Sequence, residues 1–444
     1  MSLQFIIGSS GIGKTHYACE YIIRESLENP QCLYYMIVPE QFTMQTQKNV
    51  VEMHPGKGIL NIDVLSFERL AYRIFEEVGG AQEVLLDDTG KSMVLQKLVQ
   101  QHKKNLPYLG SQMNKPGYLD EVKSLISEFM QYDIHEDDLE NMLGKAGQES
   151  LLYMKMQDVG ILYQAFLQYL EGHYMTGEGV MDALKKAVPF SSKLRNAVLL
   201  LDGFTGFTPV QMNVIQELLA VCSKVLVTVT LDAGENPLQK GKPHQLFYMS
   251  RKMIHTLSGL TNDLDEPVLL SEKKKGRFQS APALGFLEQH LFRYKRASYG
   301  KEQDEIRIFA AESPIKEMEE TARRIRRMVR EEGMKYGEIA VITGNLEAYK
   351  SISTQVFEEA QIPFFLDEKH TILMNPFVEY IRSALEMAAK DFSYESVFRY
   401  LRCEMSAITR EQADMLENYV LALGIRGYKK WSEKWIRVYR TMRE

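Results

Sequence analysis

The sequence predicts an α/β fold in which a parallel β-sheet is covered by helices on both faces. Three observations predict it. Short runs rich in β-branched residues alternate with longer segments of helical periodicity, the runs are apolar at consecutive positions, and the first run leads into a glycine-rich motif that opens a helix. Strands that are apolar throughout are typical of sheets buried on both faces.

The predicted elements follow from these patterns in chain order. Five apolar runs are predicted strands of the first sheet, at residues 3–8, 33–40, 60–67, 197–204 and 224–232. From about residue 83 to 195 apolar residues recur three and four apart, which predicts helices alone. A second α/β pattern has strands predicted at 306–313, 338–345 and 362–367, and the segment from about residue 375 is again helical.

These patterns predict the domain organisation. We expect a first domain at 1–82 and 196–300, a helical insertion at 83–195, the start of a second α/β domain at 301–375 and a further helical insertion at 376–444. The last segment has helical periodicity without a stop signal, so we expect the natural chain to continue beyond it.

Charge and cysteine usage exclude several classes of protein. Lysine and arginine number 53 against 59 aspartates and glutamates, so the net charge of −6 excludes a polycation that coats nucleic acid, and any DNA-binding face must be local. The four cysteines lie far apart, without the spacing of a zinc site or a disulfide framework. No apolar run could span a bilayer and no basic region opens the chain, so we expect a cytoplasmic protein that does not bind a membrane.

The strongest functional signal is a complete G-x-x-x-x-G-K-[ST] motif between the first predicted strand and a helix. Its residues are Gly8, Ser9, Ser10, Gly11, Ile12, Gly13, Lys14 and Thr15. Glycines let backbone N–H groups wrap a phosphate, and the helix amino terminus adds the positive end of its dipole. We expect ATP to bind here, with Lys14 reaching the β and γ phosphates and Thr15 completing a Mg²⁺ shell. The alternative is a tight glycine-rich turn without a ligand.

Hydrolysis of ATP requires further groups, of which the fourth predicted strand supplies one. Asp202 follows that strand, where an acidic residue would hold Mg²⁺, but the next residue, Gly203, has no side chain to orient a water molecule. Gln211 comes later, and sequence alone does not bring it to the phosphates. The alternative role of Asp202 is to cap the turn after the strand. We expect no catalytic residue in this chain.

Candidate DNA contacts follow the third predicted strand. Arg69 and Arg73 lie among aromatic residues, and single-strand channels combine positive charge with aromatic faces. The alternative is that this helix serves the core, because Phe67 and Leu70 have helical spacing. Gln41, just past the second strand, is a candidate for nucleotide or DNA contact, since ligands bind at the carboxyl edge of such sheets.

Several segments together resemble the superfamily 1 helicases and, more narrowly, the AddB family of subunits from bacterial AddAB helicase-nucleases, which process double-strand DNA breaks. The resemblance rests on GSSGIGKT (8–15), IVPEQFT (37–43), IDVLSFERLAYR (62–73), LLLDGFTGFTPVQ (199–211), EIAVITGN (338–345) and IPFFLD (362–367). It implies a P-loop NTPase domain followed by a second RecA-like α/β domain, with ATP and Mg²⁺ as ligands. It also implies an AddA-like motor subunit and DNA, as single strands and duplex ends, as partners.

The departures from a working helicase are equally informative. A superfamily 1 motor carries Glu at Gly203, Gly-Asp followed by Gln at 229–232 and an Arg near Gly344, and this sequence departs at all three. The resemblance thus implies the amino-terminal part of an enzyme subunit that binds ATP and DNA for recombinational repair without hydrolysing ATP itself. A nuclease domain and an iron–sulfur cluster are expected only in full-length family members. Two alternatives remain, an independent P-loop ATPase and a nucleotide-insensitive DNA-binding scaffold.

Overall fold

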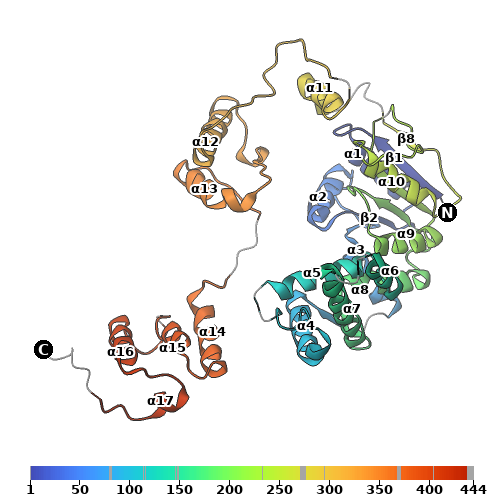
Figure 1. Ribbon diagram of the computed structural model, residues 1–444. Helices are drawn as coiled ribbons and strands as arrows, with labels where there is room; N and C mark the ends of the chain where they lie inside the picture. The colour runs from blue at the N-terminus through green and yellow to red at the C-terminus, as the bar shows by residue number, and fades with distance from the viewer. Residues whose placement is uncertain are drawn as a thin grey trace. The chain divides into compact units, whose positions relative to one another are not determined.

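The chain divides into two compact units, Met1–Arg307 and Ile308–Glu444. The computed structural model, shown in Figure 1, describes residues 2–79, 83–113, 115, 117–145, 147, 150–232, 234–270, 277–294, 296–367, 372–403 and 405–437. The first unit contains the sheet and the glycine-rich motif, and the second is described on its own below.

The first unit is built on a six-stranded, all-parallel sheet with the order β3-β2-β6-β7-β1-β8. Its strands are β1 (Ser2–Gly8), β2 (Tyr34–Ile37), β3 (Ile62–Leu65), β6 (Val198–Leu201), β7 (Lys224–Thr230) and β8 (Val268–Leu269). All but β8 coincide with the apolar runs that predicted them, so the parallel sheet is confirmed. The sequence missed β8, because two residues are too few to form a pattern.

Helices cover both faces of this sheet. One face carries α1 (Lys14–Glu28) and α2 (Thr43–Met53). The other carries α3 (Phe67–Val78), α8 (Gly177–Ala187), α9 (Pro209–Val221) and α10 (Tyr248–Ser258).

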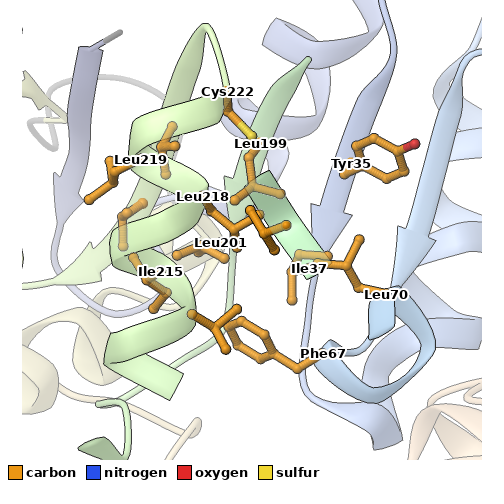
Figure 2. Close-up of a cluster of buried hydrophobic side chains, with 14 of the residues drawn as sticks. Tyr35, Ile37, Phe67, Leu70, Leu199, Leu201, Ile215, Leu218, Leu219 and Cys222 are labelled. Carbon is orange, nitrogen blue, oxygen red and sulfur yellow. The ribbon is translucent and has the colours of Figure 1, made fainter. Parts of the chain in front are cut away.

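Successive side chains of the inner strands β2 and β6 enter opposite cores. Figure 2 shows Ile37 of β2 and Leu201 of β6 packed with Leu218 of α9 on one side of the sheet. Met36 and Leu200, their neighbours in the chain, belong to the core beneath α1 and α2. Because both faces are buried, the strands are apolar at consecutive positions, which is the pattern that predicted them.

A helical layer with its own apolar core lies between α3 and α8 in the chain. It consists of α4 (Asp88–His102), α5 (Tyr118–Gln131), α6 (Glu136–Lys145) and α7 (Leu151–Leu170). The prediction of helices alone for this region is corrected by a parallel pair of short strands, β4 (Val84–Leu86) and β5 (Tyr174–Thr176). Strands of three residues are too short for alternation to be recognised.

The helices of the second unit follow the helical patterns of the sequence. They are α12 (Pro314–Glu331), α13 (Leu346–Glu359), α14 (Pro376–Ala389), α15 (Tyr394–Leu401), α16 (Arg410–Leu423) and α17 (Tyr428–Ser432). The first unit ends with one more helix, α11 (Pro282–His290). Short 3-10 helices are η1 (Glu40–Phe42), η2 (Lys103–Asn105), η3 (Val188–Phe190), η4 (Arg277–Ser280) and η5 (Tyr336–Glu338).

The strands predicted for the second unit, at 306–313, 338–345 and 362–367, are not strands in the part of the chain that the structure describes. Residues of all three segments line a cavity of about 900 Å³ beside α12 and α13. No backbone hydrogen bond joins the described residues of these segments to one another, and a strand exists only where a neighbouring strand supplies such bonds. Two of their apolar side chains, Ile342 and Phe365, are 92% and 88% exposed.

Candidate nucleotide-binding site

The glycine-rich loop lies at the carboxyl end of β1 and leads into α1. Gly11 and Gly13 have left-handed backbones, with φ of 75° and 100°, which glycine adopts without strain. A Cβ atom at Gly8 would come within 2.6 Å of Cγ2 of Ile12. Gly13 is also the N-cap of α1 and supplies no side-chain acceptor to its first turn. A helix start without a side-chain cap favours an anion as its partner.

Lys14 is the first residue of α1, and its side chain folds back over the loop. Its Nζ donates a hydrogen bond to the carbonyl oxygen of Ser9 at 2.8 Å. Burial lowers the pKa of Lys14, and the charges of Asp202 and Glu288 oppose this shift. An ammonium group that has lost hydration gains most from a direct anionic ligand.

The structure brings Asp202 and Thr15 together, although they are far apart in the sequence. Oδ1 of Asp202 accepts hydrogen bonds from Oγ1 of Thr15 at 3.2 Å and from Oγ1 of Thr228 at 2.6 Å. Asp202 is 5% exposed and directly follows β6, so its backbone position is set by the sheet. A carboxylate and a hydroxyl are the oxygen ligands that Mg²⁺ prefers, so this pair fits the ion expected with a nucleotide.

A cavity of about 600 Å³ opens beside Lys14 and Thr15 and is also lined by Asn49 and Glu52 of α2. Its volume is within the range of small-ligand sites. Cys19 lines it as well, but burial raises the pKa of its thiol to about 12. The thiol is therefore neutral near pH 7 and supplies no thiolate.

The other predicted contact residues lie apart from this cavity. Gln41 is exposed in η1, at the carboxyl edge of the sheet. Arg69 and Arg73 are half-exposed on α3, where they form ion pairs with Glu40 at 3.1 Å and with Asp63 at 3.2 Å.

The aromatic residue that precedes these arginines has a packing role. The ring of Phe67 is 5% exposed and lies edge-on to the rings of Phe204 and Phe207, at centroid distances of 5.7 and 6.3 Å. The core alternative for Phe67 is therefore what the structure shows, and this buried ring is no base-stacking surface.

Three positions that bear on hydrolysis have other contacts. Gly203 has φ of 80°, a backbone conformation that Glu and other non-glycine residues rarely adopt. Gln211 forms a capping box with Thr208, whose N–H donates to the Gln211 side chain at 3.0 Å. Asp232 accepts a hydrogen bond from the guanidinium of Arg293 at 2.7 Å. The side chains of Gln211 and Asp232 are thus engaged in a helix cap and an ion pair.

Two residues at the site were not predicted from the sequence. Thr228 contacts Asp202 from β7, and its signal is a polar residue in a strand whose other central positions are apolar. Glu288 of α11 accepts a hydrogen bond from the N–H of Ser10 at 3.3 Å. No local pattern marks Glu288, because a chain separation of 278 residues is closed only by the fold.

The described residues contain neither a cluster of metal ligands nor a helix suited to a bilayer. Among them, no group of three or more His, Cys, Asp or Glu side chains is arranged to hold a metal ion. In the same part of the chain, no helix has the length and apolar character needed to cross a membrane.

Comparisons with known proteins agree with the resemblance. The family model described as "ADDB, N-terminal" matches residues 5–288. Curated proteins named as the B subunit of an ATP-dependent helicase/deoxyribonuclease are similar along the whole chain. The one from Lachnoclostridium phytofermentans is 42% identical over 99% of this chain and 39% of its own length. Those from Caldanaerobacter subterraneus and Clostridium novyi are 36% and 33% identical over 98% of this chain and 37% and 38% of their own lengths.

The matches cover nearly all of this chain but only part of each relative. The chain spans less than two fifths of the length of these curated relatives. The family model, in contrast, matches more than half of the chain, including the glycine-rich loop, Asp202 and α11 as far as Glu288. The chain therefore belongs to the AddB family.

Proposed function

We propose that residues 8–15 bind the phosphates of ATP and that Thr15 and Asp202 hold its Mg²⁺ ion. The hydrogen bond between Thr15 and Asp202 carries this proposal, because it joins the start of α1, just after the glycine-rich loop, to the carboxyl end of β6. Lys14 supplies positive charge beside it. Bound Mg²⁺ would neutralise phosphate charge, while the chain's own residues bind and orient the nucleotide.

At the level of the whole protein, we propose that this chain is the helicase-like amino-terminal part of an AddB subunit. The subunit would act with an AddA-like motor subunit on DNA ends during recombinational repair. Support comes from the name of the curated relatives, which describes one subunit of an ATP-dependent helicase and deoxyribonuclease. We assign nuclease chemistry and an iron–sulfur cluster to no residue of this chain.

We further propose that the nucleotide is bound without being hydrolysed. Gly203 carries no side chain, Gln211 serves as a helix cap and Asp232 is paired with Arg293. Orienting the attacking water in a P-loop enzyme takes a carboxylate or an amide near the γ-phosphate. Here ATP would stabilise a state of the subunit that holds DNA, and the motor subunit would drive movement.

The test is to measure ATP–Mg²⁺ binding by calorimetry and ATP turnover by phosphate release, each with and without single-stranded DNA. We expect binding without DNA-stimulated turnover. Turnover that is lost in Asp202→Ala would overturn the proposal in favour of an independent ATPase. DNA binding that is unchanged by ATP and by Lys14→Ala would favour the nucleotide-insensitive scaffold.

Restoring the helicase residue at position 203 is not expected to restore hydrolysis. A non-glycine residue at the left-handed backbone of Gly203 costs about 1–2 kcal/mol of stability, and a Glu held in a strained turn is poorly placed. Gly203→Glu should therefore lower the thermal midpoint without creating turnover. Gly206→Glu is the matched control, since Gly206 has no positive φ. A rise in DNA-stimulated turnover in Gly203→Glu would show that the missing carboxylate alone disables the site.

Arg69 and Arg73 are proposed DNA contacts, and their contribution should appear in the salt dependence of binding. Each guanidinium is half-exposed and paired with a carboxylate that a DNA phosphate would replace. Replacing both by alanine should reduce the slope of log K against log salt by about 1.4, at about 0.7 per phosphate contact on a single strand. Arg24→Ala, at another exposed ion pair, is the control. An unchanged slope would leave both arginines with a purely structural role.

A further inference from the structure

The segment 277–290 lies against the glycine-rich loop. The N–H of Arg277 donates a hydrogen bond to the carbonyl oxygen of Gly11 at 3.3 Å. The ring of Phe278 comes within 3.0 Å of the point where a Cβ atom at Gly11 would lie. The Cβ of Phe278 is equally close to the corresponding point at Gly285 of α11. Phe278 therefore lies between the loop and α11 and couples the position of the helix to the loop.

The same segment places a carboxylate on the loop. Oε1 of Glu288, near the end of α11, accepts the hydrogen bond from the N–H of Ser10 at 3.3 Å. Its negative charge also acts on Lys14. Backbone N–H groups and a lysine ammonium are the groups with which such loops bind phosphate. Glu288 thus places a carboxylate on the groups that, in the proposed function, bind the phosphates of the nucleotide.

We propose that α11 is a strap whose Glu288 carboxylate competes with the phosphates of the nucleotide, so that nucleotide binding releases segment 277–290 from the loop. The inference rests on the proposed function, because the competitor is a nucleotide bound at residues 8–15. The contacts of Arg277 and Phe278 hold the strap when no phosphate is present. Repulsion between the Glu288 carboxylate and the phosphates would then displace it, and the position of α11 would report the nucleotide state of the site.

The first measurement is the dissociation constant for ATP–Mg²⁺ of the full chain and of Glu288→Gln. Glutamine keeps a side-chain oxygen and removes the charge, so ATP affinity should rise about threefold to fivefold, the scale of one exposed charge interaction. Glu305→Gln, which removes a charge from an exposed position outside the strap, should leave the affinity unchanged. Binding that depends on Lys14 but is equal or weaker in Glu288→Gln would overturn the strap while leaving the proposed function intact.

The second measurement is hydrogen exchange of the amides of Ser10 and α11. ATP should accelerate exchange across residues 282–290 in the unaltered chain, and Glu288→Gln should accelerate it without ATP. The nucleotide-free comparison tests the contact between the strap and the loop independently of ATP binding. The absence of ATP binding in every variant would instead be a failure of the proposed function. Slower exchange in α11 with ATP, or equal nucleotide-free exchange in the two proteins, would contradict the inference.

Discussion

Replacing Lys14 by alanine is expected to weaken ATP binding by about 30- to 150-fold, the effect of losing a charge-assisted hydrogen bond worth roughly 2–3 kcal/mol. The side chain is partly desolvated at the start of α1 and now donates to Ser9, a neutral carbonyl. Phosphate would offer this ammonium group a charged acceptor. The loss should appear as an increase in the dissociation constant in calorimetric titration with ATP–Mg²⁺.

The control for this experiment is Lys252→Ala, at an exposed lysine of α10. It removes the same charge from the surface, so its ATP affinity should equal that of the unaltered chain. Thermal unfolding of both variants should change little, since neither lysine belongs to an apolar core. ATP affinity retained in Lys14→Ala would mean that the glycine-rich loop is a turn without a ligand, the alternative that the sequence left open.

The central sheet could be predicted because its physical cause is local. A strand buried on both faces needs apolar residues at consecutive positions, and the runs around Ile37, Leu201 and Val227 have them. The glycine-rich loop is equally local, since its motif, its preceding strand and its following helix are contiguous in the chain. Asp202 was predicted to share a Mg²⁺ ion with Thr15 because a P-loop enzyme takes an acidic Mg²⁺ ligand from the end of another strand.

The features that were not predicted depend on contacts between residues that are far apart in the chain. Ile342 and Phe365 lie in segments with the composition of strands, but a strand also needs a neighbour at hydrogen-bonding distance, which composition does not supply. Thr228 and Glu288 are ordinary residues in their own segments and acquire a role only through the positions of β7 and α11. The ion pairs of Arg69 and Arg73 are likewise made by residues on other elements.

The largest expected loss of stability comes from Lys91, a buried lysine in the helical layer. Lys91 of α4 is 6% exposed, and its Nζ donates to both carboxylate oxygens of Glu178, at 2.9 and 3.0 Å, and to Ser127. Glu178 lies in the first turn of α8, whose Val180 and Leu184 belong to the core of the sheet. The ion pair therefore joins the helical layer to the sheet domain.

Lys91→Met should lower the free energy of unfolding of the first unit by about 3–5 kcal/mol, because it leaves the Glu178 carboxylate buried without its partner. Adding Glu178→Met should recover most of this loss, since an apolar pair of similar volume replaces the ion pair at little cost. Lys97→Met, at an exposed lysine of the same helix, should change the stability by less than about 1 kcal/mol. Equal stability of Lys91→Met and Lys97→Met would show that water reaches the Glu178 carboxylate.

The positions of the tryptophans make this measurement specific to one unit. Both tryptophans, Trp431 and Trp435, belong to the second unit, so their fluorescence reports its unfolding, while circular dichroism reports the whole chain. In urea, Lys91→Met should shift the dichroism transition and leave the fluorescence transition in place.

The pKa of Glu178 is lowered in the folded chain by the hydrogen bond and charge of Lys91, against the opposing effect of burial. The ion pair therefore contributes its full stabilisation above the ordinary Glu pKa, and this stabilisation is lost as pH falls through the lowered value. The difference in free energy of unfolding between the unaltered chain and Lys91→Met should therefore narrow in acid.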